Sequence, residues 1–345
     1  MSVARVIHDL ANIGKSVMVV EHDITLLDYL SDYVYVLYGE PSTYAIVSGV
    51  LNAKAGINVF LDGYLPNENV RFRDQAFRFE TAAGTEDFIQ DEVFAEYSEL
   101  EKHYSAFKLS AAAGKIRKGE VVGVIGANAL GKTTLMKMLA GVEKPDNGRV
   151  DVKAKISYKP QYLNQEYEGD VRSLLDAAYR TPVEGTSIEE QIILHLGVRK
   201  LYEKMIKSLS GGELQKVAVV ACLLREADIY AFDEPSAFLD VEDRIALAKF
   251  IQRFVRAQGK SALIIDHDLQ LIDMVADTLI LFAGRSGIEG RSTETLPKRH
   301  GMNLFLQGLE LTYRRDPDSN RPRVNKIDSR LDRTQKESRN YYLTN

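Results

Sequence analysis

The sequence predicts an α/β protein whose central sheet is mainly parallel. A short apolar segment, 121–125, runs directly into a glycine-containing loop and then into a helical pattern that reaches Leu139. A second apolar segment, 228–232, ends in two acidic residues, and ligands bind at the carboxyl ends of strands in open α/β sheets. Residues 170–208 instead show apolar spacing that suits helices. These patterns predict a parallel sheet with a helical insertion.

The loop after the first apolar segment reads GANALGKT over residues 126–133. Its two glycines let the backbone approach a phosphate, and the following helix presents its positive N-terminal end to the anion. Lys132 is expected to reach the β and γ phosphates, and the Thr133 hydroxyl to bind Mg²⁺. The pattern predicts an ATP-binding site made of Gly126, Asn128, Gly131, Lys132, Thr133 and Thr134.

Length and composition limit the class of protein. With 345 residues and 45% apolar content, the chain can bury one large core or two modest ones. Its net charge of −5 gives no general reason for a polyanionic partner. No run approaches the ~18 apolar residues of a membrane helix, and the N-terminus lacks a signal-peptide layout, so we expect a cytoplasmic protein without a membrane partner. The single cysteine, Cys222, is interpreted as a core residue, and we expect no iron–sulfur cluster in this chain.

Four further motifs follow the phosphate loop in order. They are Gln161 in SYKPQYL, the segment LSGGELQ at 209–215, the pair Asp233-Glu234 before Pro235, and His267 in ALIIDHD. This series resembles the ATP-binding cassette family, and LSGGELQ is its most specific member. The resemblance implies a P-loop NTPase cassette with a mainly parallel sheet, a helical signature subdomain and an antiparallel β edge region.

The same resemblance implies roles for these residues. Asp233 would hold Mg²⁺, with Thr133 and Gln161, and Glu234 would orient or deprotonate the attacking water. His267 would contact the γ phosphate, so the catalytic set is Glu234, His267 and Gln161. The signature residues would serve ATP bound by a partner cassette; they are Ser210, Gly211, Gly212 and Glu213.

Each of these residues also has a structural alternative. Gln161 could be a solvated turn residue, the acid pair could cap a helix at Pro235, and His267 could be a surface imidazole between two aspartates. The aromatic side chain that stacks on adenine is open among Tyr97, Tyr104 and Phe107. We favour Phe107, which could equally be a core residue of a strand.

Part of the sequence occurs twice. Residues 17–39 align without a gap with 262–284, and GINVFLDGYLP at 56–66 matches GMNLFLQGLEL at 301–311, both at an offset of 245 residues. A repeat of this length is one whole cassette. We therefore predict a remnant of a first cassette at 1–45, which contributes its last strand, His22 and a C-terminal helix, and a hinge segment at 46–75. A complete second cassette would follow at 76–300, and a second hinge segment with a basic tail at 301–345. His22 receives no catalytic role.

The paired GINxF and GMNxF elements and the tail TYRRDPDSNRPRVNKIDSRLDR resemble the RNase L inhibitor family, the ribosome-recycling ATPases of archaea and eukaryotes in the E subfamily of cassette proteins. The likeness covers essentially the whole chain but only the C-terminal part of that architecture. It implies ATP hydrolysis with Mg²⁺ to split ribosomal subunits, with ribosomes and translation factors as partners. The family's two iron–sulfur clusters cannot come from this chain, which has one cysteine.

In this family ATP is sandwiched between two cassettes. We therefore expect the isolated chain to bind MgATP but to hydrolyse it slowly, unless a complementary cassette or self-association completes the site. The loop also departs from the usual G-x-N-G-x-G-K-T at Ala129. If that position needs a positive φ, alanine costs roughly 1 kcal/mol.

Two other functions share part of this pattern. An ATPase subunit of a membrane transporter would carry every nucleotide motif but gives no reason for the duplicated elements or the tail. A non-hydrolysing fragment would bind nucleotide or ribosomes without turnover. The tail is either a solvated, partly disordered terminus, a strap over the hinge, or a contact to ribosomal RNA through Arg321, Arg323, Arg330 and Arg333.

Overall fold

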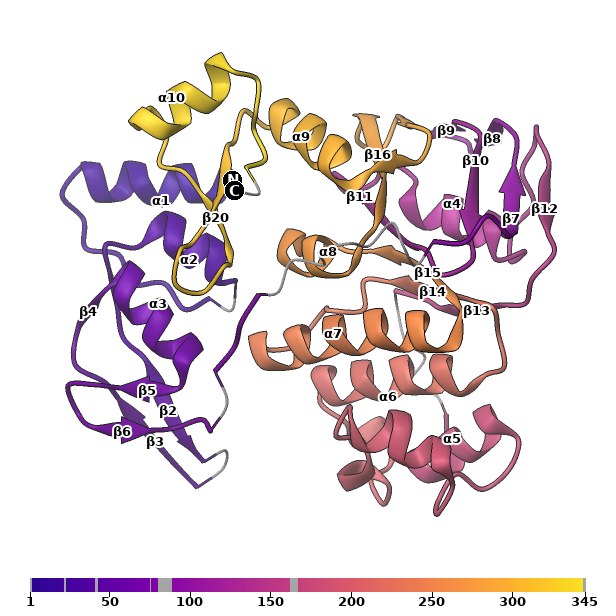
Figure 1. The fold of residues 1–345 in the computed structure, drawn as a ribbon, viewed down its shortest axis with the longest axis horizontal. Coiled ribbons are helices and arrows are strands. Elements are labelled where there is room, and N and C mark those ends of the chain that lie inside the picture. The colour runs from indigo at the N-terminus through magenta and orange to yellow at the C-terminus, as the bar shows by residue number, and fades with distance from the viewer. Residues whose placement is uncertain are drawn as a thin grey trace. The chain divides into compact units, whose positions relative to one another are not determined.

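A computed structural model describes residues 2–21, 23–40, 43–74, 76–79, 89–161 and 167–343. The chain forms two compact units, which are described separately (Figure 1). Unit 1 comprises Met1–Thr81 and Leu306–Asn345, and unit 2 comprises Ala82–Phe305. The four-part division made from the sequence stays a prediction. His22 lies outside the described residues.

Unit 2 is built on a nine-stranded sheet with the order β13-β14-β15-β11-β16-β17-β9-β8, and β18 pairs with β16. The five strands from β13 to β16 are parallel, which confirms the predicted mainly parallel sheet. Every residue of β14 and β15 is buried, as continuous apolar strands of parallel sheets are. The strands are β8 (Leu100–His103), β9 (Lys108–Ala111), β11 (Val121–Gly126), β13 (Ile156–Lys159), β14 (Ile229–Asp233), β15 (Ser261–Ile265), β16 (Thr278–Arg285), β17 (Glu289–Ser292) and β18 (Leu296–Pro297).

An antiparallel region flanks this sheet, as the family resemblance predicted. A separate three-stranded sheet has the order β10-β7-β12, with β7 at Val93–Tyr97, β10 at Gly114–Arg117 and β12 at Val150–Val152. Buried residues of both sheets and of α4 (Lys132–Leu139) form one hydrophobic cluster. This cluster fixes the strand and the helix on either side of the phosphate loop.

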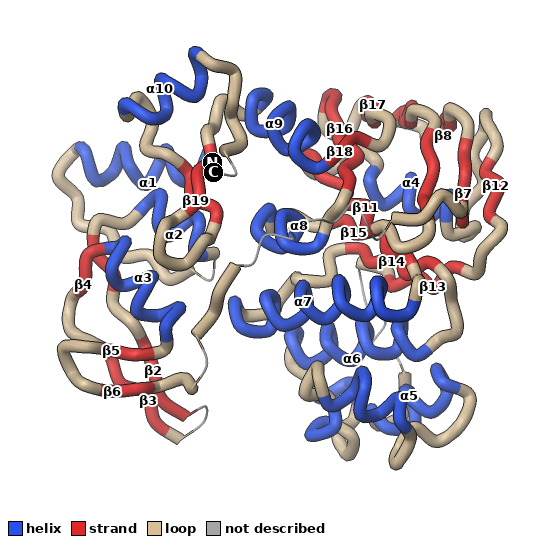
Figure 2. The backbone as a smooth tube through the Cα atoms, in the orientation of Figure 1, coloured by secondary structure: helices blue, strands red, loops and turns tan. Residues whose placement is uncertain are grey.

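In the view of Figure 2, α5 (Val171–Tyr179), α6 (Gly211–Leu224) and α7 (Val241–Gln258) form the lower part of unit 2. Two further helices follow in the sequence, α8 (Leu269–Val275) and α9 (Lys298–Gly308). Three short turns lie between α5 and α6: a π-helix at Glu189–Leu194 and 3₁₀ helices at Arg199–Leu201 and Ile206–Ser208. The described residues of 167–210 therefore confirm the predicted helical insertion.

Unit 1 joins the two ends of the chain. Its helices are α1 (Ser2–Asn12), α2 (Ile24–Leu30), α3 (Ala53–Asp62) and α10 (Arg330–Glu337). Its strands pair in twos: β1 (Tyr33–Val34) with β4 (Leu51–Asn52), β2 (Leu37–Glu40) with β3 (Tyr44–Val47), β5 (Tyr64–Leu65) with β6 (Val70–Arg71), and β19 (Tyr313–Arg315) with β20 (Pro322–Val324).

A buried ionic cluster, Asp28 with Arg321, Arg323 and Asp316, holds α2 to the C-terminal segment. Arg323 donates to both carboxylate oxygens of Asp28 at 2.6 and 2.8 Å, and Arg321 donates to one of them at 3.2 Å. These contacts count against the alternative that Arg321 and Arg323 bind RNA, because Arg321 is 0% exposed and both side chains pair with buried carboxylates. The tail is also folded rather than disordered, since β20 and α10 lie within it. Arg330 and Arg333 are exposed.

The expected last strand of a first cassette is absent from the described residues 17–21, which have no regular secondary structure. Met18 and Val20 are 87% and 89% exposed, whereas the aligned Leu263 and Ile265 are 1% exposed within β15. β15 lies between β14 and β11, and residues 17–21 pair with no strand among the described residues. An apolar sequence becomes a strand only when neighbours supply its hydrogen bonds.

Candidate nucleotide site

The phosphate loop connects the buried strand β11 to helix α4. Gly131, the N-cap of α4, has φ +94°, and Gly126 has φ +153°, so both use backbone conformations that side chains disfavour. A Cβ at Gly126 would lie 2.7 Å from Phe282 Cβ. The sequence therefore needs glycine at these two positions to bring the loop N–H groups to the start of the helix.

Ala129 stands where the usual G-x-N-G-x-G-K-T loop has glycine. Its φ is +57°, so this position does adopt the left-handed conformation. Alanine there costs about 1 kcal/mol relative to glycine. Two hydrogen bonds from the β16–β17 turn support this part of the loop. Ser286 Oγ donates to Asn128 O at 2.7 Å, and the Gly287 N–H donates to Ala129 O at 2.9 Å.

Lys132 lies in the first turn of α4 with its amine folded against the loop. Its Nζ donates to Gly126 O at 2.9 Å and to Ala127 O at 2.7 Å. Burial lowers the pKa of Lys132, while the nearby Glu234 and Asp233 charges raise it. The single cation of the loop is thus close to both acids at the end of β14.

Asp233 ends β14 with both carboxylate oxygens buried and without a hydrogen bond of normal geometry to the protein. Burial raises its pKa, and so does the charge of Glu234, whereas Thr133 lowers it. A buried, unpartnered carboxylate is unfavourable unless a cation neutralises it. The described residues hold no cluster of three or more His, Cys, Asp or Glu side chains suited to a metal. Thr133 and Asp233 therefore fit a Mg²⁺ whose remaining ligands are phosphate and water.

The structure brings Glu234 and His267, both predicted site residues, into contact. His267 Nε2 lies 2.8 Å from Glu234 Oε1, and the two residues follow the neighbouring strands β14 and β15. The helix-cap alternative for the acid pair is wrong, because residues 235–238 form a turn and the next helix, α7, is capped by Asp240.

Gln161, the predicted Mg²⁺ ligand and catalytic residue, lies at the edge of the described residues. Gln161 is half-buried in the bend after β13, and 162–166 lie outside the described residues, so its role stays a prediction.

Of the three aromatic candidates for stacking on adenine, Tyr97 is excluded because its ring is buried; burial also raises its pKa to about 12. Phe107 lies beside the loop, because a Cβ at Gly131 would be 3.1 Å from Phe107 Cζ. Its ring centroid is 6.4 Å from that of the exposed Tyr104. Phe107 and Tyr104 remain the two candidates.

The signature segment begins α6. The exposed Ser210 is the N-cap: its Oγ accepts from the Glu213 N–H, and a Glu213 carboxylate oxygen accepts from the Ser210 N–H, which is a capping box. Gly212 must stay small, since a Cβ there would lie 2.9 Å from Phe238 O. α6 and α4 lie apart within unit 2 (Figure 1). The exposed N-terminal end of α6 is therefore available to a ligand other than one on the α4 loop.

Two functional neighbours were missed by the sequence analysis. Lys159 in β13 and Gln215 in α6 are each 1% exposed and donate to the main-chain carbonyls of the acid pair. Burial lowers the pKa of Lys159 to about 8, although Asp233 and Asp266 raise it. Two signals were present in the sequence: Gln215 closes the LSGGELQ segment, and Lys159 ends the strand ISYK.

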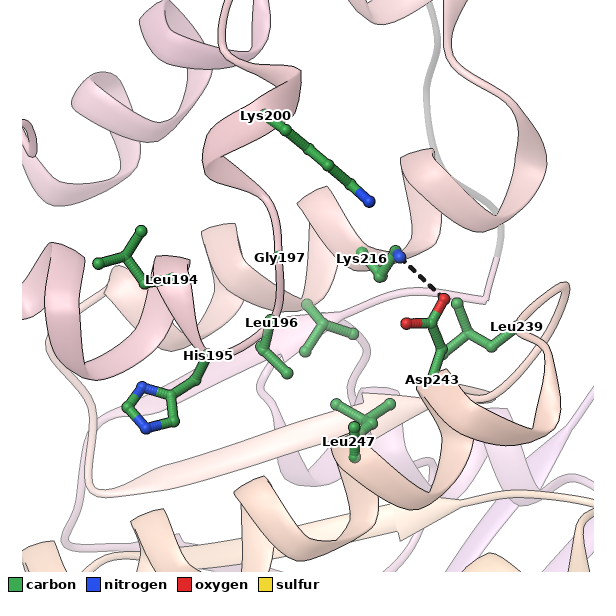
Figure 3. Close-up of a pocket in the computed structure, with 11 residues that line it drawn as sticks. Leu194, His195, Leu196, Gly197, Lys200, Lys216, Leu239, Asp243 and Leu247 are labelled. Atoms are coloured by element: carbon green, nitrogen blue, oxygen red, sulfur yellow. Dashed lines mark hydrogen bonds and ion pairs between the residues drawn. The ribbon is translucent and has the colours of Figure 1, made fainter. Parts of the chain in front are cut away.

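A separate cavity of about 190 Å³ lies among the helices of unit 2 (Figure 3). An ion pair between Lys216 of α6 and Asp243 of α7 crosses one side of it at 2.8 Å. It is lined by Leu194, His195, Leu196, Gly197, Lys200, Lys216, Val219, Leu239, Asp243, Ala246 and Leu247. None of the phosphate-loop or acid-pair residues lines this cavity.

Comparison with known proteins identifies the family. Residues 109–237 match the family described as ABC transporter. ABC transporter E family member 3 of Arabidopsis thaliana is 36% identical over 162 residues, which are 90% of that protein and 45% of this chain. The chain belongs to the ABC transporter E family. Unit 2 thus carries the ATPase cassette fold of this family.

Longer E family relatives match nearly the whole chain. Translation initiation factor RLI1 of Saccharomyces cerevisiae is 41% identical over 99% of this chain and 57% of its own length. A model of ribosome-bound archaeal Pelota and ABCE1 gives a TM-score of 0.92 at 48% identity, over 99% of this chain and 57% of that chain. A complex of archaeal stalk protein aP1 with archaeal ribosome recycling factor aABCE1 gives 0.91 at 46%, over 98% and 65%.

This E family chain spans little more than half the length of these curated relatives. In the part of the chain that the structure describes, no helix is long and apolar enough to cross a membrane. The matches cover 98–99% of this chain, so unit 1 as well as the cassette is shared with these relatives.

Proposed function

We propose that this chain binds and hydrolyses MgATP and that this reaction drives ribosome recycling, with ribosomal subunits and translation factors as partners. The observation that carries the chemistry is the meeting of Glu234, His267 and the buried Asp233 beside the phosphate loop. The likeness of the whole chain, unit 1 included, to a ribosome recycling factor supports the biological assignment over a transporter subunit. A cytoplasmic location follows from the same proposal.

The proposed chemistry assigns one task to each side chain. Lys132 and the loop N–H groups bind the β and γ phosphates, and Thr133 and Asp233 hold Mg²⁺. When bound, Mg²⁺ neutralises charge on the transferred phosphoryl group. Glu234 accepts a hydrogen bond from the attacking water and orients it. His267 Nε2 lies 2.8 Å from the Glu234 carboxylate and would contact the γ phosphate.

The site is proposed to be complete only with a second cassette. The exposed signature end of α6, Ser210 to Glu213, would contact ATP on another cassette, and a contact supplied in trans can be worth roughly 10³ to 10⁵ in rate. The partner is either a complementary cassette or a second copy of this chain. The isolated chain is therefore expected to turn over slowly.

Steady-state ATPase activity over a range of chain concentrations, with and without ribosomal subunits, tests the proposal. Turnover per chain that rises with concentration or with subunits, and that disappears in Glu234→Gln, supports composite sites and ribosome coupling. Negligible turnover that does not change with chain concentration or subunits, together with tight MgATP binding, would reject hydrolysis by this chain. Only the nucleotide-binding part of the proposal would then stand. Turnover that persists in Glu234→Gln would reject the role of Glu234.

A further inference from the structure

Glu234 has an unusual backbone conformation. Its φ is +49°, in the left-handed region that costs a residue with a side chain about 1 kcal/mol. Strain of this kind persists only where the surroundings hold it, and it is common at functional sites. The direction of the Glu234 side chain depends on this conformation, because Asp233 ends an extended strand immediately before it.

Buried donors hold the peptide groups on both sides of Glu234. Gln215 Nε2 donates to Glu234 O at 2.5 Å, and Lys159 Nζ donates to Asp233 O at 2.8 Å and to Glu234 O at 3.4 Å. The Glu234 N–H donates to Ile265 O at 2.8 Å. The hydrogen bond from the Glu234 N–H continues the pairing of β14 with β15. Gln215 and Lys159 instead hold the Glu234 carbonyl, whose direction is set by the left-handed conformation of this residue.

Gln215 belongs to the same helix as the signature residues. Ser210 caps α6, and Gln215 follows five residues later. Further along the helix, Ser157 Oγ of β13 donates to Cys222 O at 2.8 Å, so α6 is also attached to the strand that carries Lys159. The helix is a single rigid element from its exposed cap to these buried contacts.

We propose that Gln215, assisted by Lys159, is a positioning residue that holds Glu234 in its left-handed conformation and links the carboxylate to the signature helix. This inference rests on the proposed role of Glu234 in hydrolysis. Without the Gln215 donor, the Glu234 peptide relaxes toward the extended region, and the carboxylate turns away from His267 and the water position. Binding of ATP at the loop does not use this contact and is retained.

Gln215→Met in the full chain is the direct test, because methionine keeps the side-chain length and removes the donor. Gln252→Met is the matched control, since Gln252 Nε2 donates from α7 to Met274 O at 3.0 Å, away from the acid pair. We expect kcat to fall about tenfold in Gln215→Met and to stay within twofold in the control, with the MgATP dissociation constant within twofold in both. Gln215→Asn, which keeps the amide but is too short to reach, is expected to behave like Gln215→Met.

A double variant with Glu234→Gln separates positioning from general destabilisation. If Gln215 acts through Glu234, Gln215→Met adds no further loss to the residual single-turnover rate that remains in the Glu234→Gln background. An equal kcat in Gln215→Met, Gln215→Asn and the control, or a further tenfold loss in the double variant, overturns the inference. Full turnover in Glu234→Gln alone would instead overturn the proposed function on which it rests.

Discussion

Nε2 of His267 lies 2.8 Å from Oε1 of Glu234, although 32 residues separate the two in sequence. They meet because β14 and β15 are parallel neighbours in the sheet, so both residues follow the same edge. The imidazole thereby fixes the carboxylate that is proposed to orient water.

Replacing His267 with alanine is expected to lower turnover by about 10² to 10³, because both the carboxylate orientation and the γ-phosphate contact are lost. His103→Ala is the matched control, since His103 Nδ1 lies 3.5 Å from Asp146 Oδ2 on the surface of the same unit. Steady-state ATPase rates check this. Equal rates in the two variants would contradict it.

Asp233→Asn should stabilise the nucleotide-free protein and weaken its use of Mg²⁺. The buried carboxylate has no hydrogen-bond partner of normal geometry, so its replacement removes a desolvation cost of about 1–3 kcal/mol. Asp228→Asn is the control and is expected to lower stability, because Asp228 accepts hydrogen bonds from Lys260 Nζ and the Lys155 N–H at 3.0 Å each. Thermal unfolding without nucleotide and ATP binding with and without Mg²⁺ measure both effects. A loss of stability in Asp233→Asn would be inconsistent with this account.

Ala129→Gly is expected to leave stability unchanged or to raise it by up to about 1 kcal/mol. Glycine relieves the left-handed strain at φ +57° but adds flexibility to the unfolded chain. Ala246→Gly, at an exposed position within α7, should instead cost about 1 kcal/mol. Chemical denaturation compares the two. The same cost at both sites would show that Ala129 is unstrained.

Asp28→Asn should destabilise unit 1 by about 3–5 kcal/mol, because it leaves the buried Arg321 and Arg323 without their main counter-charge. Lys54→Gln is the control: it removes an exposed pair with Asp318 at 3.7 Å in the same unit and should cost less than about 1 kcal/mol. Hydrogen exchange of unit 1 amides reports the local effect. Protection in Asp28→Asn that matches the control would reject the ionic cluster as a stabilising element.

The carboxyl group of Asp316 is expected to make the stability of unit 1 fall at low pH. Burial would raise its pKa, but the Ser319 and Asp318 N–H groups, the Ser319 hydroxyl and Arg321 lower it below the usual 3.8. A lowered folded-state pKa adds stability above the unfolded pKa, and this stability is lost as pH falls through the folded value. Asp316→Asn should therefore cost about 2 kcal/mol at pH 7, and the difference from the unaltered chain should shrink below about pH 4. A difference that stays constant from pH 7 to pH 3 would disprove this.

Short-range patterns explain which parts of the site were predictable. The phosphate loop, the acid pair and His267 each follow an apolar strand, so local sequence was sufficient to place them at one edge of the sheet. The contacts of Gln215 and Lys159 could not be predicted, because a side chain that donates to a distant main-chain carbonyl leaves no pattern in the sequence. The ion pairs of Arg321 and Arg323 could not be predicted for a related reason: their partner Asp28 precedes them by 293 and 295 residues. The strand expected at 17–21 failed because a strand depends on neighbours that periodicity does not encode.

The salt bridges of Asp28 also set an order of assembly during synthesis on the ribosome. Residues 82–305 emerge before 306–345, so the cassette has all of its sequence available while unit 1 still lacks its C-terminal segment. The N-terminal segment must then wait with its aspartate uncompensated until the two arginines are translated. Unit 1 therefore cannot complete its ionic cluster until residue 323 has been made, and a chain truncated before residue 321 would keep the whole cassette sequence but lack both arginine partners of Asp28.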